Sequence, residues 1–512
     1  MMCCKSLLLS VALTVLVSIN AYAEKNWNQF RGPQGDGVAD SSNLPIEFDE
    51  STNIRWKIPI AGSGWSSPVI WENEVWVTTG DDAKRELRAI CIELETGNVK
   101  HDLKVFDMVE RKLDPAYVYD SPHLNSPATP TAVVEQDRIY ISFGSQGIAC
   151  LDRVTGEAIW QRRDLRIYQP VRQASSPIVD EENLYVAFDG TDQQFFIALH
   201  KEDGTTRWKV NRQVETDWAQ TLRGSGIGSV KSGKPNDNRK SFATATMIKV
   251  DGTRQLIAPA AEAIISYDPD NGNELWRTVH PGGFNVAARP IFANNLVYVF
   301  TSGLNHFLMG IRPDGRGEVT DTHVEWLTSK STPNIPSPIV KDDLLFMVTD
   351  KGGIARCLDA ITGEEIWKKR LGGDHWASPV LADGKLYFCS KQGEVFVMEP
   401  LRDSPEVLAA NEMNASFIAS PAVTGDAIIL RSTTHLYCVA QGYRRTPEQV
   451  AADVYPEQNL ARSMKSKSPK TNSQSGNLAK LSSQLREMVK AGVLTREDAV
   501  ELYQTAAGKT EK

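Results

Sequence analysis

A short sequence unit recurs along most of this chain, and it limits the fold more than any other feature. In the unit, a turn glycine is followed four positions later by tryptophan. The four regular copies end at Gly156/Trp160, Gly204/Trp208, Gly272/Trp276 and Gly363/Trp367. Repeats at intervals of roughly 40 to 70 residues are typical of solenoids, propellers and arrays. The strand content of the units decides between these architectures.

Each unit is predicted to contain four short strands. In the copy spanning residues 337–367, the segments SPIV, DDLLFMVT, GIARCLD and EEIWKK each have the composition of a short β-strand. The turn before the last segment carries Gly363, because glycine tolerates the positive φ of a tight hairpin. Four-stranded antiparallel meanders repeated around an axis build a β-propeller.

The number of blades follows from the unit openings, where a small residue usually precedes proline. The openings are Ser67-Pro68, Ser126-Pro127, Ser176-Pro177, the degenerate stretch 242–247, Arg289-Pro290, Ser337-Pro338, Ser378-Pro379 and Ser420-Pro421. We therefore expect an all-β, eight-bladed propeller. The last unit lacks a tryptophan strand, whereas a strand around Trp56 precedes the first unit. This N-terminal strand is predicted to complete the last blade.

The repeated tryptophans are interpreted as structural, because a large apolar residue at a repeated position packs between units. They are Trp56, Trp160, Trp208, Trp276 and Trp367. Most of the five cysteines after residue 23 lie in or beside predicted third strands. We interpret them as small buried residues. A disulfide framework is the alternative.

The pattern Asp-x-x-Thr-Gly-x-x-x-Trp, as in LDRVTGEAIW and LDAITGEEIW, resembles the repeats of the pyrroloquinoline-quinone (PQQ) propeller superfamily. That superfamily includes quinoprotein alcohol dehydrogenases and the outer-membrane assembly factor BamB. The resemblance covers roughly residues 27–442. It implies the propeller fold, whereas the motif describes how blades pack and says little about chemistry.

The resemblance also indicates what a catalytic member would contain. Quinoprotein dehydrogenases hold PQQ beside a disulfide between adjacent cysteines, with Ca²⁺ bound by carboxylate and amide oxygens, and many carry a C-x-x-C-H haem site. After residue 23 this chain has no adjacent cysteines and no such haem motif, and its histidines lack zinc-site spacing. We therefore expect no catalytic residue, metal or cofactor. PQQ with calcium is the alternative.

Polar and aromatic side chains precede several of the innermost strands. His123, Gln173, Asn334 and His375 each lie four positions before an opening proline, and Trp65 and Trp376 each lie three before one. We expect these residues to gather at one mouth of the central channel. Polar groups among tryptophans could receive a peptide, a sugar or a small ligand. Packing at the rim is the alternative.

The first 23 residues are predicted to be a signal peptide. Lys5 precedes an apolar run from Leu7 to Ile19, and Ala21-Tyr22-Ala23 offers the small residues of a cleavage site. The run is too short to span a bilayer. Cleavage after Ala23 would place the protein in the periplasm or outside the cell. The net charge of −8 provides no basic stripe for nucleic acid.

The composition changes after the repeats. The propeller is predicted at 24–443, a flexible linker at 444–476 and a helical hairpin at 477–512, where leucines recur at helical spacing. Two such helices are too small to hold a core of their own, so we expect them to dock on the propeller or on a partner.

The function favoured by these features is an exported, non-catalytic propeller scaffold for protein binding or assembly, similar to BamB, with protein partners in the cell envelope. Two alternatives stay open. One is a PQQ-dependent quinoprotein oxidoreductase, and the other is a periplasmic binder of small ligands or carbohydrates.

Overall fold

The computed structural model describes residues 26–109, 124–169, 171–212, 239–303, 306–330 and 332–453. The predicted signal peptide, most of the predicted linker, the predicted helical hairpin at 477–512 and His123 lie outside the described residues. The chain divides into two units, Met1–Val450 and Ala451–Lys512. All the strands belong to the first unit.

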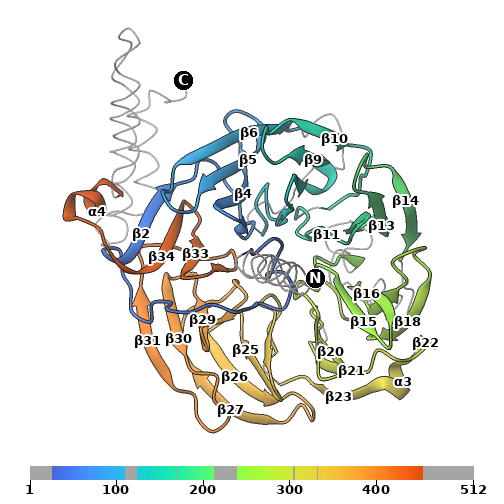
Figure 1. Cartoon of the computed structure of the whole chain (residues 1–512). Coiled ribbons are helices and arrows are strands. Elements are labelled where there is room, and N and C mark those ends of the chain that lie inside the picture. Colours follow the sequence, from blue (N-terminus) through green and yellow to red (C-terminus); the bar gives the residue numbers. More distant parts are fainter. Residues whose placement is uncertain are drawn as a thin grey trace, which may run out of the picture. The chain divides into compact units, whose positions relative to one another are not determined.

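Eight sheets, each built on a four-stranded antiparallel meander, are arranged around a centre and confirm the predicted propeller (Figure 1). Blade 1 comprises β3 (Val69–Trp71), β4 (Glu74–Asp81), β5 (Glu86–Glu93) and β6 (Val99–Asp107). Blade 2 comprises β7 (Val133–Val134), β8 (Arg138–Ser142), β9 (Ile148–Asp152) and β10 (Ala158–Arg162). Blade 3 comprises β11 (Ile178–Val179), β12 (Asn183–Asp189), β13 (Gln194–His200) and β14 (Thr206–Asn211). Blade 4 comprises β15 (Thr246–Val250), β16 (Thr253–Pro259), β17 (Ala263–Tyr267) and β18 (Glu274–Val279).

The remaining blades follow the same plan. Blade 5 comprises β19 (Ile291–Ala293), β20 (Leu296–Phe300), β21 (Leu308–Ile311) and β23 (Val324–Thr328). Blade 6 comprises β24 (Ile339–Lys341), β25 (Leu344–Val348), β26 (Ile354–Asp359) and β27 (Glu365–Arg370). Blade 7 comprises β28 (Val380–Ala382), β29 (Lys385–Cys389), β30 (Glu394–Met398) and β31 (Val407–Glu412). Blade 8 comprises β32 (Ala422–Thr424), β33 (Ala427–Arg431), β34 (His435–Arg444) and β2 (Thr52–Pro59).

Two short strands extend the blades in parallel. β1 (Val38–Ala39) pairs with β28 on the inner side of blade 7, and β22 (Gly317–Glu318) pairs with β18 on the outer side of blade 4. A 3-10 turn, η2 (Gly144–Gln146), and two α-helices, α3 (Thr320–His323) and α4 (Pro447–Asp453), complete the described elements. α4 falls within the stretch predicted to be a linker. Neither α-helix in this part of the chain has the length and apolar character needed to cross a membrane.

The ring closes as the sequence predicts. β2, from the N-terminal side, pairs antiparallel with β34 of the last blade, with Trp56 opposite Cys438 (Figure 1). The outermost strand of blade 8 therefore comes from the start of the propeller and its other three strands come from the end. Separating the first blade from the last requires breaking this sheet.

Tryptophans on the outer strands join neighbouring blades, and we call Trp56, Trp160, Trp208, Trp276, Trp326 and Trp367 the outer belt. The indole nitrogen of Trp160 donates to the Lys201 carbonyl of the next blade at 2.8 Å. The turn glycine of that blade, Gly204, packs on the same ring, and a Cβ there would lie 2.6 Å from the indole. Trp56 and Trp208 make equivalent contacts with the blades that follow them. The glycine therefore serves inter-blade packing as well as the turn.

Blade 1 departs from the pattern in a compensated way. His101 stands where the belt tryptophan would be, opposite Cys91. The second strand of this blade supplies the tryptophan instead, because Trp76 lies on the other side of Cys91 and stacks on the His101 ring at 5.7 Å. The large aromatic ring has moved inward by two strands, so the interface with blade 2 stays filled.

The five cysteines of the described chain are free and buried, as the sequence interpretation expects. Cys150, Cys357 and Cys438 each face a belt tryptophan across the third and fourth strands. Burial raises the pKa of the Cys150 thiol to about 12. These thiols are small packing residues that stay protonated at neutral pH.

Candidate functional site

One residue at the start of each innermost strand contributes to a hydrogen-bonded ring around the channel. At seven of the eight positions the backbone N–H donates to the side-chain hydroxyl of the next blade, as in Ser67 to Thr131 at 2.9 Å and Ser378 to Ser420 at 2.9 Å. We call the eight positions the inner ring. They are Ser67, Thr131, Ser176, Thr244, Arg289, Ser337, Ser378 and Ser420. Seven carry a hydroxyl group.

The opening predicted for blade 2 is wrong. Ser126-Pro127 does not begin the innermost strand, which starts at Val133 and has Thr131 as its inner-ring residue. Ser126 instead forms a local turn, in which its hydroxyl accepts the Ala128 N–H and its N–H donates to the Thr129 hydroxyl. A short Ser-Pro turn in this loop resembles a strand opening in sequence.

The inner ring is interrupted at Arg289, which has no hydroxyl to accept the hydrogen of Thr244. Its guanidinium reaches the N-terminal segment instead, donating to the Phe30 carbonyl and, at 3.4 Å, to the Gln29 side chain. Its Nε also donates to Thr246 at 3.2 Å. The one exception in the ring is therefore the point where the N-terminal segment is anchored.

Residues 26–37 cross one end of the channel and form its floor. Trp27 exchanges two backbone hydrogen bonds with Ile70 of blade 1, at 2.8 and 2.9 Å. Further along, the Arg31 guanidinium donates to the Pro338 and Pro379 carbonyls of blades 6 and 7, at 2.6 and 3.2 Å. The segment thus spans from blade 1 to blade 7 below the inner ring.

We call the side of the propeller that this segment covers the back face. The side where the innermost strands begin is called the front face.

Glycines allow the floor to lie close to two guanidinium groups. Gly35 and Gly37 have φ of +72° and +82°, and a Cβ at either position would overlap the guanidinium of Arg289 or Arg31. Burial is the main cause that lowers the pKa of Arg31 to about 9. Asp36 opposes this shift, and Arg289 adds to it. Burial also lowers the pKa of Arg289 to about 10. Both side chains remain cationic at neutral pH.

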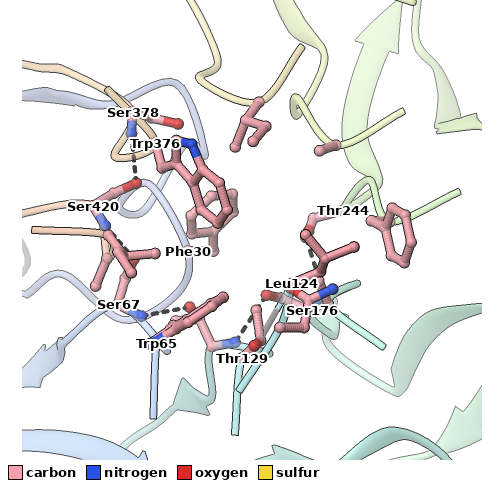
Figure 2. Close-up of a pocket in the computed structure, with 18 of the residues that line it drawn as sticks. Phe30, Trp65, Ser67, Leu124, Thr129, Ser176, Thr244, Trp376, Ser378 and Ser420 are labelled. Atoms are coloured by element: carbon pink, nitrogen blue, oxygen red, sulfur yellow. Dashed lines mark hydrogen bonds between the residues drawn. The ribbon is translucent and has the colours of Figure 1, made fainter. Parts of the chain in front are cut away.

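Above the floor lies a cavity of about 340 Å³ (Figure 2). Phe30 forms part of its base, and six inner-ring hydroxyl residues form its wall. The six are Ser67, Thr131, Ser176, Thr244, Ser378 and Ser420. Lys240 is the one charged side chain among the described residues that line it. The wall is therefore mainly hydroxyl, amide and apolar.

The cavity is aromatic on one side of its front-face mouth. Trp65 and Trp376 meet edge to face, with centroids 5.9 Å apart, and Figure 2 shows both with Phe30 around the same space. The Lys391 ammonium lies 3.9 Å from the centroid of the Trp376 ring. Leu124, also in the lining, is 45% exposed. Apolar surface is therefore accessible at the mouth.

Three of the residues that the sequence placed at a channel mouth line this cavity: Trp65, Asn334 and Trp376. Asn334 is fixed in place, since its amide donates to Asp350 at 3.1 Å and its oxygen accepts from Ser302 at 3.0 Å.

The other predicted residues are not part of the lining. Gln173 packs beside Gly144. His375 is fully buried against Gly372 and Phe396, and burial lowers its pKa. His123 lies outside the described residues.

Sequence reasoning missed the floor. It found six of the eight inner-ring residues as strand openings but did not predict the hydrogen bonds that join them. Phe30 and Arg31 precede the first repeat unit, and nothing in the repeat pattern includes them. The signal that could have found them is the glycine-rich run Gly32-Pro-Gln-Gly-Asp-Gly37, a segment too glycine-rich for a strand just before the ring-closing strand.

The architecture defines the class of protein: an eight-bladed propeller with one end of its channel covered by its own N-terminal segment. Within that class, the family described as outer membrane protein assembly factor BamB matches residues 38–162, 107–369 and 198–442. These matches cover most of the chain, and the chain belongs to this family. A search of curated proteins found no match.

Solved structures similar to this chain include two dehydrogenases and a BamB structure. A europium-containing methanol dehydrogenase aligns with a TM-score of 0.61 at 11% identity, covering 82% of this chain and 99% of its own. Quinohemoprotein alcohol dehydrogenase from Comamonas testosteroni aligns with a TM-score of 0.61 at 10% identity, covering 84% and 83%. BamB from Moraxella catarrhalis aligns with a TM-score of 0.49 at 12% identity, covering 75% and 98%. At these identities the likeness shows the fold alone.

The chemistry of the lining does not fit PQQ with calcium. Calcium is held by several carboxylate and carbonyl oxygens, and the described lining residues include no carboxylate. The buried cysteines lie in the sheets and not in the cavity wall. No cluster of three or more His, Cys, Asp or Glu suited to a metal occurs among the described residues. We derive no reaction step through this cofactor.

Proposed function

We propose that this protein is an exported, non-catalytic binding propeller that acts as a scaffold for proteins of the cell envelope, as the name of its family suggests. The observation that carries the proposal is the composition of the central cavity. Its described wall consists of hydroxyl, amide and apolar groups with one lysine. Neither a paired acid and base nor an activated nucleophile is present in that wall, and both acid–base and covalent catalysis need such groups.

The front-face mouth is the proposed contact surface. Trp65, Trp376 and Leu124 present aromatic and aliphatic surface around an opening of a rigid ring. Aromatic anchors set in a pocket are where the binding energy of protein interfaces concentrates. On the back face, by contrast, residues 26–37 of the chain itself occupy the channel end.

The non-catalytic part of the proposal is tested by titrating the purified protein with PQQ and Ca²⁺. We expect no stoichiometric uptake of the quinone by absorbance and no dye reduction with alcohols or sugars as donors. A quinoprotein dehydrogenase of the same superfamily, loaded in parallel, is the positive control. Stoichiometric uptake together with substrate-dependent dye reduction would establish the oxidoreductase alternative and remove the scaffold proposal.

The binding part is tested with affinity-tagged full-length protein and its Trp376→Ala variant, recovered from the cell envelope after cross-linking. We expect partner proteins to be recovered with the unaltered protein and strongly reduced with the variant. A control variant, Ile159→Ala, changes an exposed residue on the outer strand of blade 2. Equal recovery with all three proteins would place the contact elsewhere.

A further inference from the structure

The inner ring leaves hydrogen-bond donors unused at the cavity wall. Each hydroxyl accepts one backbone N–H from the preceding blade, as Ser176 does from Thr131 at 2.9 Å. A hydroxyl also carries one hydrogen to donate. None of the six hydroxyls that line the cavity donates that hydrogen to another described residue in the structure. All six side chains are at least nine-tenths buried.

Ring geometry fixes where these oxygens lie. Each hydroxyl oxygen accepts a backbone N–H of the preceding blade, which fixes the position of the oxygen. The hydroxyl hydrogen can then rotate toward the cavity without any movement of the backbone. A ligand that offers oxygen acceptors and no donors suits this wall. Neutral amides and alcohols offer fewer acceptors than a carboxylate, which can take up to about four hydrogen bonds on its two oxygens.

The charges around the cavity favour an anion. Lys240 lines it, and the guanidinium of Arg289 donates a hydrogen bond to the carbonyl of the floor residue Phe30. Arg31, itself a floor residue, is also buried, and Asp36 is the carboxylate that acts on both arginines. Two guanidinium groups beside one carboxylate leave excess positive charge. Excess buried charge is costly unless another ion compensates it.

The rest of the cavity is apolar. Phe30, Trp65, Phe242 and Trp376 supply aromatic surface next to the hydroxyl wall. A cavity of about 340 Å³ has room for one aromatic ring with a short substituent. The cavity, which is closed at one end by the floor, thus combines hydroxyl donors, nearby cationic side chains and aromatic walls.

We infer that the central cavity binds a small carboxylate with an apolar or aromatic body, whose carboxylate accepts hydrogen bonds from the inner-ring hydroxyls while its body contacts the aromatic side chains. The site goes beyond the proposed scaffold function and stands without it. The carboxylate has two sources, a free organic acid or the C-terminus of a partner protein. Both share the same chemistry.

The test is calorimetric titration of the full-length protein with benzoate and with benzyl alcohol, which has the same ring without the charge. Two further probes are a short peptide ending in phenylalanine with a free carboxylate and its C-terminal amide. We expect benzoate, the free-carboxylate peptide or both to bind, and their neutral counterparts to bind at least roughly tenfold more weakly, because bonds to a charged acceptor are lost. Peptide binding without benzoate binding would identify a protein C-terminus as the source.

Two variants provide a matched comparison. Ser176→Ala and Ser337→Ala each remove one inner-ring hydroxyl and one N–H···O bond of the ring, at 2.9 and 2.8 Å. Only Ser176 lines the cavity. We expect Ser176→Ala to weaken carboxylate binding several-fold and Ser337→Ala to leave it unchanged, with similar melting temperatures for both.

Two results would overturn the inference: equal affinity for charged and neutral probes, or equal losses in the two variants. Because these titrations use no partner protein, a failed pull-down leaves them unaffected, and their failure leaves the scaffold proposal standing.

Discussion

The outer belt and the inner ring both join neighbouring blades, but they do so with different chemistry. The belt uses bulk: Trp160 covers the turn glycine of the next blade, Gly204, and its indole N–H donates to the Lys201 carbonyl of that blade. The ring uses small hydroxyl residues whose oxygens accept backbone hydrogens from the neighbouring blade. Both repeat around the propeller, and the residues of both are buried except for Trp326 of the belt, which is half-buried.

The belt and the ring differ at the positions that depart from their repeat patterns. In the belt, the exception at His101 is compensated within the same blade by Trp76, so the packed volume is kept. In the ring, the exception at Arg289 is not compensated by another hydroxyl but serves a second task, holding the floor of the cavity. Each belt indole N–H donates a hydrogen bond, whereas the hydroxyl hydrogens of six ring residues have no described acceptor and lie at a cavity. The belt is thus structural, and the ring is where we propose binding.

The largest expected effect is the loss of ring closure. Trp56→Ala removes the belt contact of the closing blade and should lower the free energy of unfolding by roughly 3–5 kcal/mol. Trp160→Ala, in a blade made from one continuous segment, should cost a similar amount. Deleting residues 26–60 should be worse than either, because blade 8 loses its outer strand. Unchanged denaturant midpoints for the deletion would show that β2 does not close the ring in solution.

The next largest difference is expected between removing an arginine of the floor and removing an arginine near the belt. Arg31→Met leaves buried carbonyls of blades 6 and 7 without their donor and should cost roughly 3 kcal/mol in the free energy of unfolding. Arg55→Met, near the belt, removes ion pairs whose acidic partners are 61% and 64% exposed. Such pairs contribute at most about 1 kcal/mol. Chemical denaturation of both variants measures the difference, and equal costs would mean that the floor is not anchored by Arg31.

Substituting two glycines with nearly the same φ distinguishes the cost of lost packing from the cost of backbone strain. Gly204 has φ +71° and lies on Trp160, whereas Gly384 has φ +70° and no atom within 4 Å of the place where a methyl group would lie. Gly384→Ala should cost about 1 kcal/mol from strain alone. Gly204→Ala should cost roughly 2–3 kcal/mol, because the belt indole must also shift. Thermal unfolding distinguishes the two, and indistinguishable losses would remove the packing role given to the turn glycine.

The smallest effect is expected in the ring itself. Ser337→Ala deletes one hydroxyl acceptor and should lower the free energy of unfolding by about 1 kcal/mol, the usual net value of one hydrogen bond. A double variant with Ser67→Ala, three blades away in the ring, should show additive losses, since distant sites act independently. Strong non-additivity measured by denaturation would mean that the ring acts as one cooperative network.

The belt and most ring residues could be predicted from sequence, but the hydrogen bonds of the ring could not. In four units a tryptophan lies four positions after a turn glycine and marks the unit, and a similar tryptophan strand without a preceding unit reveals the orphan strand at Trp56. The ring joins different blades, accepts either Ser or Thr, and in blade 2 is obscured by the Ser126 turn. The local opening pattern therefore finds most ring residues, whereas the hydrogen bonds between them depend on neighbours in space.

The floor was harder still to predict. Arg31 bonds to carbonyls 307 and 348 residues away, and no local pattern encodes such a contact. The mouth was predicted in part, because Asn334 lies four positions before an opening proline and Trp65 and Trp376 lie three before one. His375, like Asn334, lies four positions before an opening proline, but its ring packs beside Phe396 and does not line the cavity.

Site-specific photo-cross-linking tests most directly whether binding resides at the mouth of the ring and not on the belt side. A photoreactive residue is placed at Leu124, 45% exposed at the cavity mouth, or at Val99, 55% exposed on the outer strand of blade 1. The two positions have similar solvent exposure, so each has a similar chance of non-specific reaction. We predict discrete cross-linked partners in the cell envelope from position 124 and none above background from position 99. Partners captured from position 99 and not from position 124 would contradict the account.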